Sequence, residues 1–200
     1  MSLLVETIKF KDGRLYNIDF HSDRFNRTRR DLFGIGLAVN LESKIVIPAY
    51  ASKGLFKCRI EYDDNIRKIE FIPYERKQIN TLRLVEAGDL EYSFKFIDRN
   101  GLNELFDKRL GCDDILIIKN GHITDTSYAN IVVKEKDGKW HTPSSYLLAG
   151  TKRAYLLGRG IISEREITPA SLRRYRELRL INSMLDIGDT EGIPVKAICF

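Results

Sequence analysis

The 200-residue chain has the composition of an ordinary soluble protein, with 43% hydrophobic and 30% charged residues. A chain of this kind can bury a substantial core, as one domain or as two small lobes. No apolar run is long enough to cross a membrane, and Glu6 and Lys9 interrupt any signal-peptide core, so we expect a cytoplasmic protein with no membrane partner. Cys58, Cys112 and Cys199 are odd in number and far apart, which argues against a disulfide framework and a zinc knuckle.

The net charge of +5 leaves open a nucleic-acid-binding protein. In such a protein, the nucleic acid would be bound by two arginine-rich stretches, residues 24–30 and 173–179. Both have apolar residues between the charges at helical spacing, so we predict that most of these arginines lie on the solvent side of packed helices. A basic surface also suits an enzyme with anionic ligands, because the field raises their local concentration. We therefore expect no nucleic-acid partner.

The first half of the chain predicts two hairpins and a helix. Its strands are expected at residues 4–10, 14–18, 56–63 and 66–72. Gly13 provides the positive φ for the first hairpin, and the helix is expected over residues 19–34, ending at a glycine. The polar segment 73–78 begins with a proline and is the predicted linker. The expected lobes are therefore residues 1–76 and residues 77–200.

The second half predicts longer helices and buried strands. Helices are expected over residues 98–110, from Gly150 through 157, and from Thr168 onward, where a proline follows the capping threonine. The apolar runs 115–118 and 130–133 predict buried strands. This irregular mixture favours an α+β fold over repeated βαβ units.

Three separated segments carry the side chains that one cofactor needs. Lys95 offers an amine in apolar surroundings, residues 121–131 include a carboxylate, and residues 148–153 form a predicted anion-binding turn. An amine for an aldehyde, a carboxylate that keeps a pyridine nitrogen protonated, and donors for a phosphate are what pyridoxal 5'-phosphate requires. His122 and His141 show no metal-ligand spacing, so no metal site is expected.

Four blocks, in this order, resemble the class IV aminotransferase family of fold-type IV pyridoxal-phosphate enzymes. They are Glu6-Thr-Ile with His21-Ser-Asp-Arg24-Phe, Lys95-Phe-Ile-Asp-Arg99, Asp113 to Ile131, and Gly150-Thr-Lys-Arg153. The resemblance runs from about residue 6 to the C-terminus. It implies a two-lobed α+β fold similar to D-amino-acid aminotransferase, with the cofactor in the cleft between the lobes and Lys95 in the C-terminal lobe. It also implies a homodimer.

The resemblance implies a role for each matched residue. Lys95 is the catalytic amine for the cofactor aldehyde, and Asp125 stands where the family usually has the glutamate that pairs with the pyridine nitrogen. Aspartate is one methylene shorter, so it has to lie closer to the ring. The further implied cofactor contacts are Arg24, Ser127, Asn130, Gly150 and Thr151. The implied substrate contacts are Arg59, Lys57 and Asn182.

Each of the main assignments has a structural alternative. Lys95 could be a core-flanked lysine whose amine reaches solvent, since Phe94 and Phe96 lie on either side of it. Asp125 could be a turn residue, and Arg24 could belong to a solvated helix face. Arg59 shares a strand face with other charged residues, and that face is either part of a binding site or merely exposed.

The C-terminal block Leu180-Ile-Asn182-Ser183-Met184 with Ile193-Pro-Val195 discriminates between reactions of the family. Transaminases typically have a small Gly-Thr-Ala type of turn there, whereas this block resembles the lyases. The resemblance thus implies conversion of 4-amino-4-deoxychorismate, a small anionic amino substrate, to 4-aminobenzoate and pyruvate for folate synthesis. The alternatives are transamination of branched-chain or D-amino acids, and a non-catalytic basic binding module.

Overall fold

The computed structural model describes residues 3–199, and the chain divides into two compact units. Unit 1 comprises Met1–Arg76 and Phe94–Asp98, and unit 2 comprises Lys77–Ser93 and Arg99–Phe200. The segment 94–98 packs with unit 1, so Lys95 lies there, whereas the sequence analysis placed it in the C-terminal lobe. The reason is backbone pairing with the first strand, which hydrophobic periodicity does not reveal.

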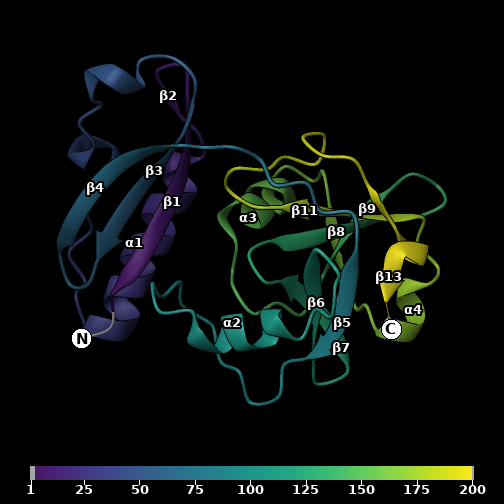
Figure 1. Cartoon of the computed structure of the whole chain (residues 1–200). Coiled ribbons are helices and arrows are strands. Elements are labelled where there is room, and N and C mark those ends of the chain that lie inside the picture. The colour runs from purple at the N-terminus through teal and green to yellow at the C-terminus, as the bar shows by residue number, and fades with distance from the viewer. Residues whose placement is uncertain (1–2, 200) are drawn as a thin grey trace. The chain divides into compact units, whose positions relative to one another are not determined.

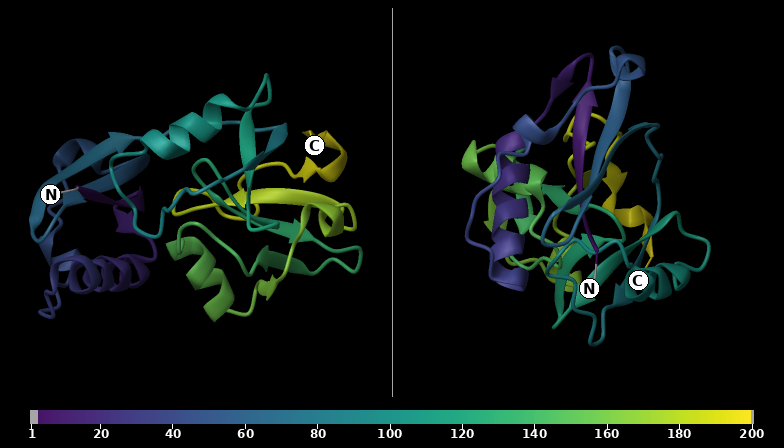
Figure 2. Two further views of the ribbon diagram at one scale, coloured as in Figure 1. Left: turned by 90° about the horizontal axis from the view of Figure 1, so that it is seen from below. Right: turned by 90° about the vertical axis from the view of Figure 1, so that its left-hand side faces the viewer.

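Unit 1 is an antiparallel sheet covered on one face by a helix. The sheet has the order β2-β1-β3-β4, and its strands are β1 (Leu4–Lys11), β2 (Arg14–Leu15), β3 (Leu55–Tyr62) and β4 (Ile66–Pro73). Helix α1 (Ile18–Phe33) runs along this sheet in every view (Figures 1 and 2). It ends at Gly34, whose φ of 69° provides the left-handed cap that the sequence predicted. Two 3₁₀ turns, η1 (Glu42–Lys44) and η2 (Ala49–Ala51), follow it.

Unit 2 is built on a larger mixed sheet. Seven of its strands follow the order β10-β9-β8-β7-β6-β5-β13, and β11 pairs with both β8 and β12. The strands are β5 (Leu82–Glu86), β6 (Asp114–Lys119), β7 (His122–Thr126), β8 (Asn130–Lys134), β9 (Trp140–Pro143), β10 (Ser163–Arg165), β11 (Glu177–Ile181), β12 (Ile193–Pro194) and β13 (Ile198–Cys199). The helical elements are α2 (Asn100–Asp107), α3 (Thr151–Gly158), α4 (Pro169–Leu172) and the 3₁₀ turn η3 (Val195–Ala197). No helix within residues 3–199 is both long and apolar enough to span a bilayer.

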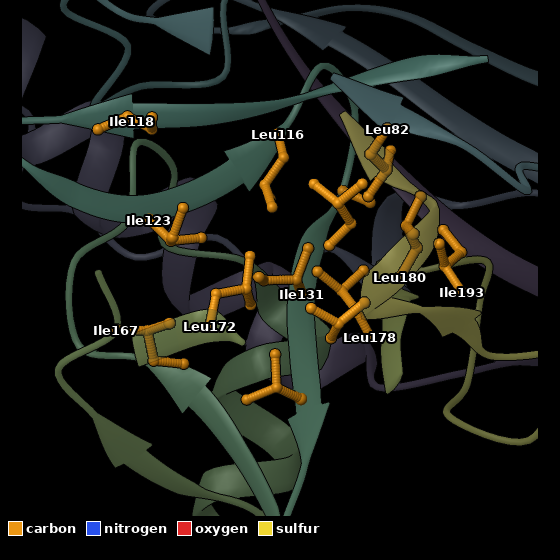
Figure 3. Close-up of a cluster of buried hydrophobic side chains, with 14 of the residues drawn as sticks. Leu82, Leu116, Ile118, Ile123, Ile131, Ile167, Leu172, Leu178, Leu180 and Ile193 are labelled. Carbon is orange, nitrogen blue, oxygen red and sulfur yellow. The ribbon is translucent and has the colours of Figure 1, made fainter. Parts of the chain in front are cut away.

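The core of unit 2 holds together the strands that carry the candidate site. Leu116 from β6, Ile123 from β7 and Ile131 from β8 converge with Leu178 and Leu180 from β11 (Figure 3). All five are less than 5% exposed, so their burial is a main source of stability for this sheet. This packing anchors the end of β7 and the start of β8, where the candidate carboxylate and its amide partner lie.

Most arginines of the two arginine-rich stretches are exposed, as expected, but only the first stretch is helical. Residues 24–30 do lie in α1, but Arg24 and Arg29 are buried, at 7% and 5% exposure. Arg29 Nε donates to the carbonyl of Asp64 at 3.0 Å, which satisfies a buried guanidinium without a carboxylate. Residues 173–179 form a turn and the start of β11 instead of a helix. Within β11, Leu178 and Leu180 are buried with the period of two of a strand, because β11 pairs with β8.

Candidate active site

A buried charge cluster occupies unit 1. Glu6 in β1 is fully buried, and Arg24 of α1 donates to both of its carboxylate oxygens, from Nε at 2.8 Å and from Nη2 at 2.6 Å. His21, one turn earlier on α1, lies 2.6 Å from the same carboxylate through Nδ1. Burial acts to raise the pKa of Glu6, but Arg24 and His21 outweigh it and lower the pKa to about 2. Glu6 therefore stays ionised and holds the guanidinium in one orientation.

Lys95 adjoins this cluster through the edge of β1. The Val5 N–H donates to the Lys95 carbonyl at 2.9 Å, and Phe96 forms a bridge with Leu4, so the backbone of this segment extends the sheet locally. The side chain of Lys95 is half-buried. Burial is the main cause of the lowered pKa of His21, and the positive charges of Arg24 and Lys95 add to it. An amine at Lys95 is thus within electrostatic reach of the buried pair.

The candidate substrate residues of unit 1 lie on β3. Arg59 Nη1 donates to the carboxylates of Glu61 and Glu70, the latter at 2.9 Å, and its side chain is 25% exposed. Lys57 Nζ lies 5.8 Å from the centroid of the Tyr74 ring. The opposite face of β3 is buried core, as its alternation predicted. Arg59 is therefore already paired with two carboxylates, and its role toward a substrate remains a prediction.

Asp125 is the central carboxylate of unit 2. It lies in β7, is 5% exposed, and accepts three hydrogen bonds. Oδ1 accepts from Asn130 Nδ2 at 2.8 Å, while Oδ2 accepts from the backbone N–H groups of Leu147 and Leu148 at 3.1 and 3.0 Å. Burial raises the pKa of Asp125 to about 6, although these hydrogen bonds and the charge of Arg153 act to lower it. Asp125 is therefore buried and held by three hydrogen bonds, unlike an ordinary turn residue at the surface.

Asn130 and Gly150 join this carboxylate to the start of α3. Asn130 Nδ2 also donates a hydrogen bond to the carbonyl of Leu148, at 3.0 Å. A Cβ at position 150 would lie 1.8 Å from Asn130 Oδ1, so only glycine allows this approach. Gly150 caps α3 without a side-chain hydrogen bond, and the first N–H groups of any helix lack intrahelical acceptors. Thr151, the first residue of α3, is buried beside this helix start.

Ser127 and Asn182 both have roles within the fold. The carbonyl of Ser127 accepts a bond from Arg99 Nη2, and the hydroxyl of Ser127 interacts with the buried carboxyl of Asp114. Asn182 Oδ1 accepts from the N–H groups of Met184 and Leu185 at 2.8 and 3.1 Å and so shapes the turn after β11. These contacts support the local backbone, and direct roles toward a cofactor or substrate remain predictions.

Sequence reasoning gave no role to Glu6, Arg99 or Asp114. Glu6 and Asp114 each have a visible signal, because a carboxylate inside or at the start of an apolar strand is rarely buried without a partner. Arg99 stands in the same block as Lys95, but nothing local to it indicates that it donates to the carbonyl of Ser127, 28 positions later.

Each unit, taken by itself, has residues of the kinds that the predicted cofactor needs. A buried carboxylate with a pKa near 6 favours a cationic partner such as a protonated pyridine nitrogen. The start of α3 has the features of a phosphate site, because N–H groups that lack intrahelical acceptors and the helix dipole both favour an anion. Lys95 adds a half-buried amine. A mixed α/β chain with this equipment has what a pyridoxal-phosphate enzyme needs.

Comparison with known proteins places the chain in that class. The family model described as "Amino-transferase class IV" matches residues 71–198. This is more than half of the chain, so the chain belongs to the class IV aminotransferase family and is an enzyme of that pyridoxal-phosphate-dependent family. The resemblance inferred from the four sequence blocks is confirmed.

Relatives with solved structures share the fold over nearly the whole chain. A structure from Haemophilus somnus, provisionally named a 4-amino-4-deoxychorismate lyase, is 33% identical, covers 96% of this chain and 98% of its own, and has a TM-score of 0.86. The pyridoxal-phosphate-bound form of a hypothetical aminotransferase from Mycobacterium tuberculosis has a TM-score of 0.76 at 15% identity, covering 98% of this chain and 81% of that chain. A Haemophilus influenzae protein described as uncharacterized is 38% identical over 183 residues, 90% of this chain and 97% of its own length. The predicted α+β, fold-type IV class is confirmed.

Proposed function

We propose that the chain binds pyridoxal 5'-phosphate and converts 4-amino-4-deoxychorismate to 4-aminobenzoate and pyruvate. The observation that carries the choice of reaction is the similarity, at 33% identity and a TM-score of 0.86, to a structure that bears the provisional lyase name. The block Asn182-Ser183-Met184 supports it, because the Asn182 side chain shapes this turn where transaminases typically have a small Gly-Thr-Ala turn.

In this proposal each residue has a defined chemical task. The cofactor, when bound, supplies an electron sink. Asp125 would hold the pyridine nitrogen, and Asn130 and the Leu147 and Leu148 N–H groups keep that carboxylate in place. Lys95 Nζ would provide the amine that holds the cofactor aldehyde. The same amine would take the proton from the ring carbon of the substrate and return a proton to the departing pyruvate carbon.

Side-by-side assays test the reaction. Purified holoenzyme is expected to release 4-aminobenzoate and pyruvate from 4-amino-4-deoxychorismate faster than it transfers amino groups from branched-chain or D-amino acids to 2-oxoglutarate. Robust transamination without detectable 4-aminobenzoate would favour the second candidate, a class IV aminotransferase, and would leave the cofactor assignment standing. Because the family assignment makes the chain an enzyme, the non-catalytic binding module is set aside.

Arg59 is proposed to bind a carboxylate of the substrate. Nη1 is taken by Glu61 and Glu70, and within residues 3–199 its Nε and Nη2 groups make no hydrogen bond. Arg59→Ala is expected to raise KM about tenfold or more with a smaller change in kcat, since a charge-assisted contact contributes about 1.5–3 kcal/mol. Lys68→Ala is the matched control, because Lys68 also pairs with Glu70 but lies exposed on β4. An unchanged KM in Arg59→Ala would show that Arg59 pairs with Glu61 and Glu70 but does not bind the substrate.

Asp125→Asn is expected to retain the fold but to lose most of the activity. A neutral amide cannot hold a pyridine nitrogen protonated, and its NH₂ group would face one of the three donors that now bind the carboxylate. The conservative control is Asp125→Glu, which keeps two acceptor oxygens and restores the residue usual in the family. Activity of Asp125→Asn close to that of the wild type would show that Asp125 is purely structural.

The same carboxyl group predicts a pH dependence of cofactor binding. With a pKa of about 6, Asp125 of the apoprotein is ionised above pH 6 and becomes protonated below it. Cofactor affinity should therefore fall as the pH drops through 6, because the ion pair is lost. The cofactor phosphate titrates in the same range, so the measured quantity is the difference in pH dependence of Kd between wild type and Asp125→Asn. Identical pH profiles would contradict the pairing.

Arg24 is proposed to contribute to phosphate binding together with Gly150 and Thr151. Nε and Nη2 of Arg24 donate to the Glu6 carboxylate, which fixes the orientation of the guanidinium. Arg24→Lys keeps a positive charge beside Glu6 but loses the planar fork, and it should weaken Kd for the cofactor more than it changes kcat. Arg27→Lys is the control, since Arg27 lies exposed on the same helix. If Arg24→Lys left the cofactor affinity unchanged, the role of Arg24 would be limited to its ion pair with Glu6.

We also propose that the active species is a homodimer, as the family resemblance implies. Sedimentation at assay concentration should show a dimer as the active form. A fully active monomer would contradict this part of the proposal.

A further inference from the structure

Two cysteine side chains of unit 2 lie in contact although they are far apart in the sequence. The sulfur atoms of Cys112 and Cys199 are 3.5 Å apart, across 87 positions of the chain. Strand pairing explains the approach. Leu82, at the start of β5, pairs with Asp114 of β6 on one side and with Ile198 of β13 on the other. Cys199 directly follows Ile198, and Cys112 lies two residues before Asp114, so their side chains meet near the start of β5.

Both cysteines sit on anchored backbone. On the Cys112 side, the neighbouring Asp113 carboxylate accepts from the N–H groups of Asn80 and Thr81 at 2.8 and 3.0 Å and from the Thr81 hydroxyl at 3.0 Å. On the Cys199 side, the neighbouring Ile198 is 4% exposed and belongs to the hydrophobic core of unit 2. The close approach is therefore built into the sheet and its adjoining loop.

The two thiols differ in accessibility, which gives them different chemical roles. Cys199 is exposed, whereas Cys112 is 9% exposed. Burial, together with the neighbouring Cys199, raises the pKa of Cys112, while the charge of Arg83 acts to lower it. Cys112 is thus a protonated thiol at neutral pH, and a small oxidant reaches Cys199 first. Cys58 in β3 is a contrast, because it is fully buried and burial raises its pKa to about 12.

We propose that Cys112 and Cys199 form a reversible intramolecular disulfide when a hydroperoxide oxidises the protein. The Cys199 thiolate attacks the peroxide oxygen, which gives a sulfenic acid and releases hydroxide when the peroxide is hydrogen peroxide. The Cys112 sulfur, losing its proton, then attacks the Cys199 sulfur and releases water. Both thiols are oxidised and the peroxide is reduced, so two thiols and one hydrogen peroxide yield one disulfide and two waters. A dithiol reverses the reaction.

The disulfide would covalently close the segment of chain between residues 112 and 199. This segment includes every strand from β6 to β13. Up to residue 199, where the described part of the chain ends, β13 pairs with β5 at two register positions. A covalent link would fix this short terminal strand to the loop before β6 and constrain the unfolded chain. The proposal does not depend on which reaction the enzyme catalyses.

Peptide mapping of oxidised protein tests the proposal. Wild-type protein is treated with a few equivalents of hydrogen peroxide, alkylated without reduction, and digested with trypsin. The expected product joins peptide 110–119 to the peptide that begins at Ala197, in protein that remains non-cross-linked between chains. Dithiothreitol should separate the two peptides. Oxidation should also raise the Tm by roughly 5–10 °C, the shift expected for a disulfide that closes a long loop in a chain of this size.

Variants make the assignment specific. Cys58→Ala keeps the pair and should give the same cross-linked product and Tm increase as the wild type. Cys199→Ser and Cys112→Ser should each lose both effects while remaining folded when reduced. Three results would overturn the proposal: Cys199 oxidised to sulfinic acid with Cys112 still free, Cys199 linked to Cys199 of another chain, or no loss of thiols in the wild type. The wild-type peptide map decides even if a serine variant fails to fold.

Discussion

Lys95→Ala is expected to abolish turnover and the visible absorbance band of the cofactor while leaving the fold intact. The fold should persist because this segment pairs with β1 through its backbone, at the Lys95 carbonyl and at the Phe96 bridge. Activity should fall by about 10³-fold or more, since general acid–base catalysis alone contributes about 10²–10⁴-fold and Lys95 is also the proposed amine for the cofactor.

The measurement that localises this amine is borohydride reduction followed by peptide mapping. Trypsin does not cleave at a modified lysine, so the labelled wild-type peptide should span residues 84–99. Lys68→Ala, which removes an exposed lysine of β4, should retain both band and label. Labelling of a peptide that contains Lys9 or Lys57 instead would remove Lys95 from the catalytic site, and retention of the band in Lys95→Ala would do the same.

Glu6→Ala is expected to destabilise unit 1 by about 3–5 kcal/mol, the usual cost of breaking a buried ion pair by removing one partner. Arg24 would keep its charge at 7% exposure while its Nε and Nη2 groups lost their acceptor, and His21 would lose the same partner. Denaturant unfolding at pH 7 measures the loss. Glu42→Ala, at an exposed position of η1, should change the free energy of unfolding by no more than about 0.5 kcal/mol.

The decrease in the free energy of unfolding at acid pH provides an independent measure of the same ion pair. Glu6 has a pKa of about 2 in the folded protein against 4.5 as its ordinary value. A lowered carboxyl pKa stabilises the folded state above the unfolded pKa, and this stabilisation, on the order of 3 kcal/mol, is lost as the pH falls from about 5 towards 2. The free energy of unfolding of Glu6→Ala should therefore depend less on pH over this range. If the free energy of unfolding fell equally steeply with pH in wild type and variant, the acid sensitivity would come from other carboxylates.

Local sequence features were sufficient to predict much of the fold. Gly34 ended α1 as predicted, since a left-handed cap is easiest for glycine. Thr168 with the following proline marked the start of α4, where Ser171 N–H donates to the threonine hydroxyl at 3.1 Å. The alternation along residues 56–63 placed β3 and its buried face. These features depend on backbone conformation or periodicity within a few residues, so they can be read without knowing the tertiary structure.

The sequence by itself also determined the family and the identity of the carboxylate block, because the residue types and their order along the chain are sufficient for that. Only the tertiary structure decided how those residues are held. The donors to Asp125 come from Leu147 and Leu148, and Lys95 lies beside β1 in unit 1, 90 positions after Val5. Arg24 is buried because Glu6 of another element lies opposite it. Such contacts depend on which strands and helices pair across long stretches of chain, and the free energy that selects this pairing comes from the whole buried core, which no local pattern records.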